Sequence, residues 1–215
     1  MIPVLVLLLL ASVKQASAQG VSAYFGVGSA NDGAGTSPGC PAKQILDEAE
    51  TTPTCEAAPT MGGVFGVFGA DFMLKPHLGV NAEYSFRFAQ ATYLQGAGIN
   101  IRPEFYDFNA VYQPTSGDKR IVPVLEGGIG GARLPLYFNV QSCITPSSCT
   151  NASEVITSLN HFQLHAAVGV KFYLKSDMFI KPQIDLHWVN NLTQQYGSNF
   201  VPQYTISIGY TFGRQ

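Results

Sequence analysis

Hydrophobic residues recur at every second position over much of this chain. From Leu78 to Ala89 one parity is apolar or aromatic, whereas the other carries Asn81, Glu83 and Arg87. A helix would scatter the two sets around its circumference, but a strand places them on opposite faces. The alternation, clear or loose, occurs in eight stretches: 21–28, 63–73, 78–89, 101–112, 121–132, 161–173, 180–188 and 203–212. The sequence therefore predicts an all-β chain of eight strands.

The connections between these stretches are short and long in strict alternation. Short ones lie at 75–77, 113–119 and 175–177, and long ones at 29–60, 90–100, 133–158 and 190–202. This alternation places every tight turn at one end of an antiparallel sheet and every long loop at the other. Such a sheet closes naturally into an up-and-down barrel, which leaves no exposed edge. Within the first long loop, the composition of residues 41–50 predicts a short helix.

Alternation alone does not show which face of the sheet contacts water. A secreted lipocalin-like barrel would turn its apolar parity inward around a ligand, whereas an outer-membrane barrel would turn it toward lipid. The polar parity here is mostly Gly, Ser, Thr, Gln and Asn rather than Lys and Glu, and aromatic residues gather near the strand ends. Both features, with the segregated loops, favour an eight-stranded antiparallel up-and-down transmembrane barrel.

Composition and the N-terminus agree with an exported membrane protein. Only 12% of the 215 residues are charged and the net charge is -2, against about a quarter charged in soluble domains. A protein that binds nucleic acid through electrostatic attraction would need more basic than acidic residues. The apolar run from Ile2 to Val13 and the small residues Ala16 and Ala18 predict a signal peptide over 1–18. Residues 19–215 would then form the barrel domain.

The chain has four cysteines, and an even number in an oxidising compartment predicts disulfides. Nearest-neighbour pairing, Cys40 with Cys55 and Cys143 with Cys149, is favoured among three connectivities. The spacing lacks the paired C-x-x-C of zinc sites. His161 and His165 share one strand face but lie about 13 Å apart at ~3.3 Å per residue, too far for one ion. We therefore expect no metal and no cofactor.

Ten charged strand residues can be assigned to the barrel interior if a bulge separates Glu104 from Asp107. They are Asp71, Glu83, Arg87, Arg102, Glu104, Asp107, Glu126, Lys171, Lys181 and Asp185. On the lipid face an Arg or Lys near the midplane would cost about 2–4 kcal/mol, and buried charges should pair. This set predicts a salt-bridged interior that stiffens the barrel. A narrow, gated ion path is the alternative.

The signal segment, the eight strands and the four long loops resemble the OmpA/OmpX-type small outer-membrane barrels. The last strand is similar to the assembly signal of such proteins at Thr205, Ser207, Tyr210 and Phe212, with Ser207 where Gly is usual. The resemblance implies a location in the bacterial outer membrane, contact with lipid and lipopolysaccharide, and recognition by the barrel-assembly machinery. It transfers no activity, because many functions share this architecture.

No catalytic set is visible in the sequence. Lipid A deacylases of similar architecture carry a His-x-Ser-Asn arrangement near the C-terminus, but the matching stretch here reads His187-Trp188-Val189-Asn190 and lacks the hydroxyl. We therefore expect no enzyme. The leading hypothesis is an anchor that presents the disulfide-bonded loops 29–60 and 133–158 to an extracellular partner. A low-conductance channel is the second hypothesis, and a secreted ligand-binding barrel is the third.

Overall fold

A computed structural model describes residues 20–32, 39–41, 44–47, 54–94, 98–115, 119–145, 148–175, 177–192 and 196–213. The predicted signal peptide, 1–18, lies outside this part. The described part contains twelve strands: β1 (Val21–Ala30), β2 (Gln44–Asp47), β3 (Thr54–Ala57), β4 (Gly63–Met73), β5 (Leu78–Arg87), β6 (Ala91–Leu94), β7 (Ile99–Ile101), β8 (Glu104–Tyr112), β9 (Ile121–Thr145), β10 (Ser148–Lys175), β11 (Met178–Val189) and β12 (Phe200–Phe212). Across the same residues, no helix has both the length and the apolarity that a membrane-crossing helix requires.

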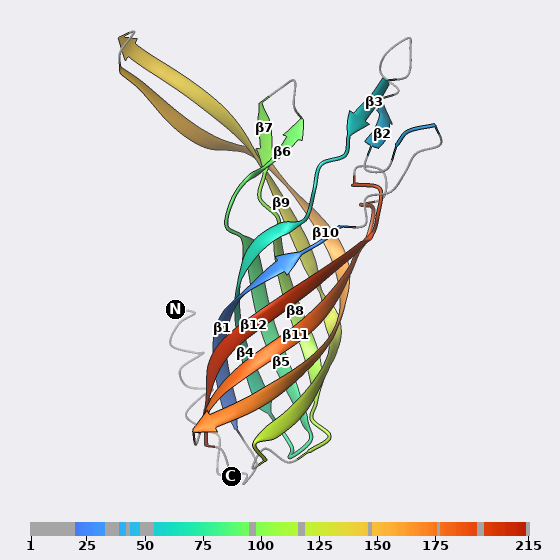
Figure 1. Cartoon of the computed structure of the whole chain (residues 1–215), viewed down its shortest axis with the longest axis vertical. Coiled ribbons are helices and arrows are strands. Elements are labelled where there is room, and N and C mark those ends of the chain that lie inside the picture. The colour runs from blue at the N-terminus through green and yellow to red at the C-terminus, as the bar shows by residue number, and fades with distance from the viewer. Residues whose placement is uncertain are drawn as a thin grey trace, which may run out of the picture.

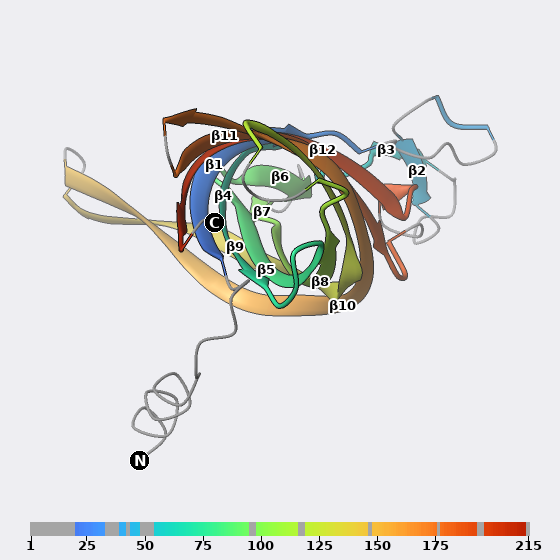
Figure 2. The same ribbon diagram turned by 90° about the horizontal axis from the view of Figure 1, so that it is seen from below.

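Eight of these strands close into an antiparallel barrel. β1, β4, β5, β8, β9, β10, β11 and β12 each pair with their neighbours along the chain, and β12 returns to pair with β1 from Phe212 opposite Val21. The strands form a ring when seen along the axis (Figure 2). The tight turns lie at one end and the long connections at the other (Figure 1). The predicted fold class and its eight strands are confirmed.

The outer wall of the barrel is apolar and the inner wall is polar. Phe108 and Phe25 are 66% and 61% exposed, whereas Lys171 and Lys181 are 1% and 0% exposed. The outward side chains of β12 extend from Phe200 to Phe212. At ~3.3 Å per residue and a strand tilt of about 40°, this stretch spans about 30 Å along the barrel axis. An apolar band of this height matches a bilayer's hydrocarbon core. The polarity is therefore that of a transmembrane barrel, as predicted.

Several inner side chains pack directly over glycine on a neighbouring strand. A Cβ at Gly69 would lie 2.2 Å from the Tyr24 hydroxyl, and one at Gly209 would lie 2.3 Å from the Phe179 ring. Glycine at these two positions lets large rings lie flat against the inner wall of a narrow barrel. The rings then fill the lumen where a smaller side chain would leave a void.

Two strands continue far beyond the barrel wall. Residues 134–145 of β9 extend past the last pair with β8, Arg133 opposite Glu104, and remain paired with β10. This projecting hairpin, residues 134–158, is the long arm of Figure 1, about 40 Å long at ~3.3 Å per residue. The sequence predicts only a long loop here, because polar residues in a solvated hairpin show no apolar alternation.

The other long connections also contain small hairpins. β2 pairs with β3, and a disulfide joins Cys40 to Cys55. The predicted helix over 41–50 is wrong, since residues 44–47 are strand β2. The backbone places Cys143 opposite Cys149, but the side chains of 139–152 lie outside the described ones. The second disulfide remains a prediction.

The predicted bulge between Glu104 and Asp107 is also wrong. β8 pairs with β5 and with β9 in one unbroken register from Glu104 to Tyr112. The irregularity lies earlier, at Arg102 and Pro103, which separate β7 from β8. Proline lacks the N–H that a ladder needs, so the strand breaks there. Without a bulge, Glu104 shares the outward parity of Tyr106 and lies on the outer wall.

Candidate functional site

The barrel interior, or lumen, is the candidate site. Each of the eight strands directs every second side chain into the lumen, because side chains alternate between the two faces of a strand. Buried polar and charged residues fill its middle: Ser22, Asp71, Asn81, Glu83, Ser85, Asp107, Asn109, Glu126, Gln163, His165, Lys171, Lys181, Gln183, Asp185, His187, Gln203, Thr205 and Ser207.

The lowest part of this polar layer is a buried ion pair. The Lys171 Nζ lies 2.7 Å from Asp71 Oδ2 and donates to Ser22 Oγ at 3.2 Å. Asn81 donates to Asp71 Oδ1 at 2.6 Å. Both charged side chains are at most 1% exposed, so the pair depends on protein partners for solvation.

A second ammonium group lies one layer higher. The Lys181 Nζ donates to Glu126 Oε1 at 3.1 Å and lies 4.0 Å from Glu83 Oε2. It also lies 3.8 Å from the centre of the Tyr24 ring, whose hydroxyl donates to Glu83 Oε2 at 2.6 Å. Lysine, two carboxylates and an aromatic face thus hold one another in place across four strands.

Two histidines lie above this layer. His165 and His187 are direct cross-strand partners on β10 and β11, and their rings stack with centroids 4.8 Å apart. His165 Nε2 is 3.2 Å from Asp185 Oδ1, and His187 Nδ1 is 3.8 Å from Asp107 Oδ2. Spacing along one strand does not reveal this pair, because its two histidines lie on neighbouring strands. A turn centred within the predicted connection 175–177 pairs residues 165 and 187, and this register is the signal in the sequence that points to it.

An apolar plug covers the polar layer at the end with the long loops. It is a cluster of buried residues from the strand ends and the connections: Ala30, Met61, Phe65, Ala91, Ile101, Phe105, Ala132, Leu134, Val189, Leu192, Tyr196 and Val201. Burial raises the pKa of the Tyr196 phenol far above its ordinary value, and that of Tyr93 beside it is also raised by burial. Both phenols therefore stay neutral, and the plug adds no charge to the lumen.

Three of the ten charged residues assigned to the interior lie elsewhere. Glu104 pairs with Arg102 at 3.7 Å and with Arg133 at 3.5 Å, on the outer wall at the rim. Arg102 is 37% exposed in its side chain, whereas Glu104 is 7% exposed because the two arginines cover it. The assignment of both residues to the lumen is wrong, since Glu104 shares the outward parity of Tyr106. The physical reason is that β8 keeps a regular register, which leaves Glu104 among its outward positions. Arg87 lies at the mouth, where its guanidinium donates to the Thr60 carbonyl at 3.3 Å.

The structure also places the residues of the predicted assembly signal. On β12, Thr205 and Ser207 are buried in the lumen, whereas Tyr210 and Phe212 are exposed on the outer wall. The Tyr210 and Phe212 rings lie 4.8 Å apart near the end of the barrel that carries the tight turns. This geometry gives the strand an aromatic outer edge. Its use by an assembly machinery remains a prediction.

The His187 to Asn190 stretch has no nucleophile in the structure either. Val189 is buried in the apolar plug, and His187 Nε2 is 3.1 Å from Gln203 Oε1 in the lumen. A lipid substrate would reach the outer wall rather than this interior. The expectation that the chain is not an enzyme stays a prediction.

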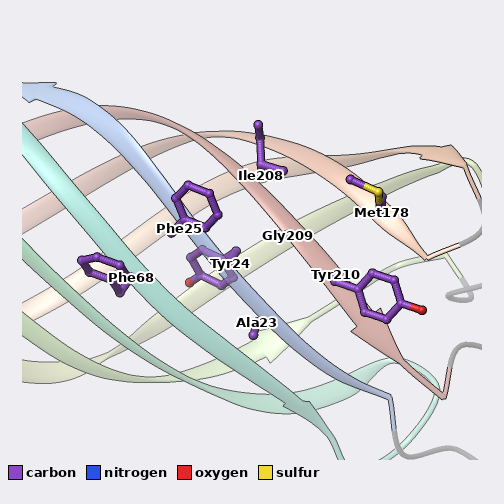
Figure 3. Close-up of a pocket in the computed structure, with 8 residues that line it drawn as sticks. All are labelled: Ala23, Tyr24, Phe25, Phe68, Met178, Ile208, Gly209 and Tyr210. Carbon is purple, nitrogen blue, oxygen red and sulfur yellow. The ribbon is translucent and has the colours of Figure 1, made fainter.

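A groove of about 370 Å³ opens on the outer wall near the turn end of the barrel (Figure 3). Small residues Ala23 and Gly209 form its floor, and Phe25, Phe68 and Tyr210 stand around it. It lies within the apolar band, where hydrocarbon chains fill such depressions. We assign it no role beyond lipid contact.

Known structures share this fold. The outer membrane protein OprG of Pseudomonas aeruginosa aligns over 91% of this chain and 97% of its own, with 15% identity and a TM-score of 0.57. Neisserial surface protein A aligns over 93% and 100%, with 12% identity and a TM-score of 0.52. No protein-family model and no curated protein sequence matches the chain.

These likenesses establish the fold and no activity. The outer membrane enzyme PagL is also matched, but at a TM-score of 0.37 it carries no argument about catalysis. The shared fold, together with the apolar outer band, confirms the predicted location in a bacterial outer membrane.

Proposed function

We propose that this chain is a closed outer-membrane anchor that presents its long loops, and above all the projecting hairpin 134–158, to a partner outside the cell. The observation that carries the proposal is the contrast between the two parts of the molecule. The lumen is filled and covered by the apolar plug, whereas β9 and β10 continue well past the rim.

The filled lumen supports a mechanical role rather than transport. An eight-stranded barrel is only just wide enough for side chains, and here Phe65 and Phe105 stack 5.7 Å apart within the plug. Below them Lys171 and Lys181 are held by carboxylates from other strands. An ion crossing this interior would have to break those pairs and then traverse an apolar layer, which is costly.

The projecting hairpin supports a role in contact. It exposes apolar side chains outside the barrel: Val155 is 54%, Ile156 is 58% and Phe138 is 42% exposed. Exposed apolar groups on a projecting hairpin are typical of interaction surfaces. The loop closed by Cys40 and Cys55 lies at the same end of the barrel (Figure 1). The partner would therefore meet both segments.

Deletion of the arm tests the contact role. Residues 137–156 would be replaced by an Asn-Gly turn, which suits a two-residue hairpin, because Leu136 and Thr157 are already paired. This change removes Phe138, Val155 and Ile156. Bacteria expressing the full chain should attach to cultured epithelial cells, and those expressing the shortened chain should not. Shortening the opposite turn, 114–118, is the matched control and should preserve attachment.

Heat-dependent migration on gels must show that each shortened barrel is folded. Attachment that survives loss of the arm, or a full chain that confers none, would contradict the proposal.

Planar-bilayer recording tests the alternative channel. The purified barrel should produce no conductance steps at any voltage that the bilayer tolerates. Steps that change when Lys181 is replaced by Met would favour an ion path through the lumen instead.

A further inference from the structure

The lumen holds a cluster of ligand-type side chains directly beneath the apolar plug. Asp107 on β8, His165 on β10 and His187 on β11 each offer one ligand atom, and the three atoms lie within 4.8 Å of one another. All three residues are buried, at 2%, 3% and 1% exposed. The Phe105 ring stacks on His187 with centroids 4.5 Å apart, so the plug closes the cluster from above.

One nitrogen in this cluster has no hydrogen-bond partner. His187 Nε2 is 3.1 Å from the Gln203 carbonyl oxygen, which requires Nε2 to donate. In the neutral ring Nδ1 is then an acceptor, yet it points at Asp107 Oδ2, another acceptor, 3.8 Å away. A buried acceptor facing a carboxylate is unfavourable unless a cation or a proton lies between them.

Both ring nitrogens of His165 lie near acceptor oxygens. Its Nε2 lies 3.2 Å from Asp185 Oδ1, a position that lets it donate to a carboxylate. Its Nδ1 faces β8, where Asn109 Oδ1 is 2.9 Å away, so the Asn109 amide would have to turn aside when this nitrogen binds an ion. Metal-bound histidines commonly give their other N–H to a carboxylate, which fixes the ring and raises its basicity. Asp185 would serve that purpose here.

The buried carboxyl groups of the lumen outnumber its lysines, and His165 is the basic partner of Asp185 at 3.2 Å. Among the described lumen residues five carboxyl groups are buried, namely Asp71, Glu83, Asp107, Glu126 and Asp185, against two lysines, Lys171 and Lys181. Lys171 contacts Asp71, and Lys181 contacts Glu126 and Glu83. Asp107 and Asp185 have no lysine within ion-pair distance among these contacts. They are the two carboxylates next to the histidines.

From these observations we infer that the lumen binds one divalent transition-metal ion, held by Asp107, His165 and His187. Two imidazoles and one carboxylate suit Zn²⁺, Co²⁺ or Ni²⁺, whereas Mg²⁺ and Ca²⁺ prefer oxygen ligands. The ion would fill the position between His187 Nδ1 and Asp107 Oδ2. It would also join β8, β10 and β11 across the lumen, adding a metal crosslink to a chain whose described disulfide, Cys40–Cys55, lies in a loop.

The test uses the whole mature chain refolded in detergent with Co²⁺, because the plug covers the site in the folded barrel. After dialysis, elemental analysis should find about one cobalt per chain, with the visible absorption of cobalt bound to nitrogen and oxygen. His187→Gln and Asp107→Asn, each close in size to the original, should lose both signals. His161→Gln is the matched control, since His161 is at the rim and contacts the Asn190 carbonyl.

The outcomes separate binding from folding. Heat-dependent gel migration must show that each variant is folded, and refolding the wild-type chain with Co²⁺ and an excess of Zn²⁺ together must suppress the cobalt spectrum. Co²⁺ lost on dialysis of the wild-type chain, or retained equally by folded His187→Gln, would overturn the inference. Loss in His161→Gln but not in His187→Gln would do so as well.

Discussion

Removing the Lys171 ammonium should be far more costly than removing a charge at the rim. Lys171→Met keeps most of the side-chain volume, so it mainly leaves Asp71 without its partner at 2.7 Å. Both side chains are at most 1% exposed, and among the described residues Asn81 still donates to Asp71, at 2.6 Å. Breaking a buried pair from one side costs about 3–5 kcal/mol, and we expect a loss of that size.

The double variant Lys171→Met with Asp71→Asn isolates the cause. It removes both charges, so the free energy of unfolding should return to within about 2 kcal/mol of the wild-type value. Arg133→Met is the matched control. Arg133 is 50% exposed in its side chain, and its pair with Glu104 should contribute about 1 kcal/mol or less.

Urea unfolding in lipid vesicles measures these differences. Trp188 is the single tryptophan and lies near the rim, so its fluorescence reports loss of the folded barrel. A cost below about 1 kcal/mol for Lys171→Met, or a double variant as unstable as the sum of the singles, would refute the reasoning about the lumen.

Two further substitutions test the wall. Val168→Arg places a charge on the outer face of β10, where Val168 is 50% exposed, and should cost about 2–4 kcal/mol in vesicles, whereas Val168→Thr should cost less; equal losses would contradict a lipid-facing position. Gly69→Ala forces the Tyr24 ring away from its place over the glycine and should cost about 1–3 kcal/mol by urea unfolding. Gly127→Ala is its control, because the nearest atom to a Cβ there is 4.0 Å away, and a larger loss in the control would argue against tight ring packing.

Much of the barrel could be predicted because lipid imposes a simple pattern. Each spanning strand must show lipid an apolar face, so period-two alternation marks all eight strands. The tight turns also fix the register: the turn centred on 176 places His165 opposite His187. Two of the failures lie outside the bilayer. The arm 134–158 and strand β2 are held by backbone pairing and a disulfide, which leave no hydrophobic period to recognise.

The charged residues were only partly predictable. Parity alone assigns Asp71, Glu83 and Lys181 to the interior, since each belongs to a regular strand, and all three side chains are buried. Glu104 was assigned to the wrong face because Pro103 interrupts the strand, whereas the predicted bulge would have exchanged its inward and outward positions. Parity also cannot show which inward side chains meet across the lumen. The cluster of Asp107, His165 and His187 depends on three strands whose relative heights follow only from the closed barrel.

Site-directed spin labelling along β5 tests the central claim, that the apolar face meets lipid and the charged face is enclosed. Single labels at Val80, Ala82 and Tyr84 in vesicles should collide freely with oxygen, which concentrates in hydrocarbon. Labels at Asn81 and Ser85, both buried, should be protected from oxygen and from a water-soluble nickel reagent. Strong nickel accessibility at Asn81 and Ser85, with the even-numbered sites shielded from oxygen, would contradict the account.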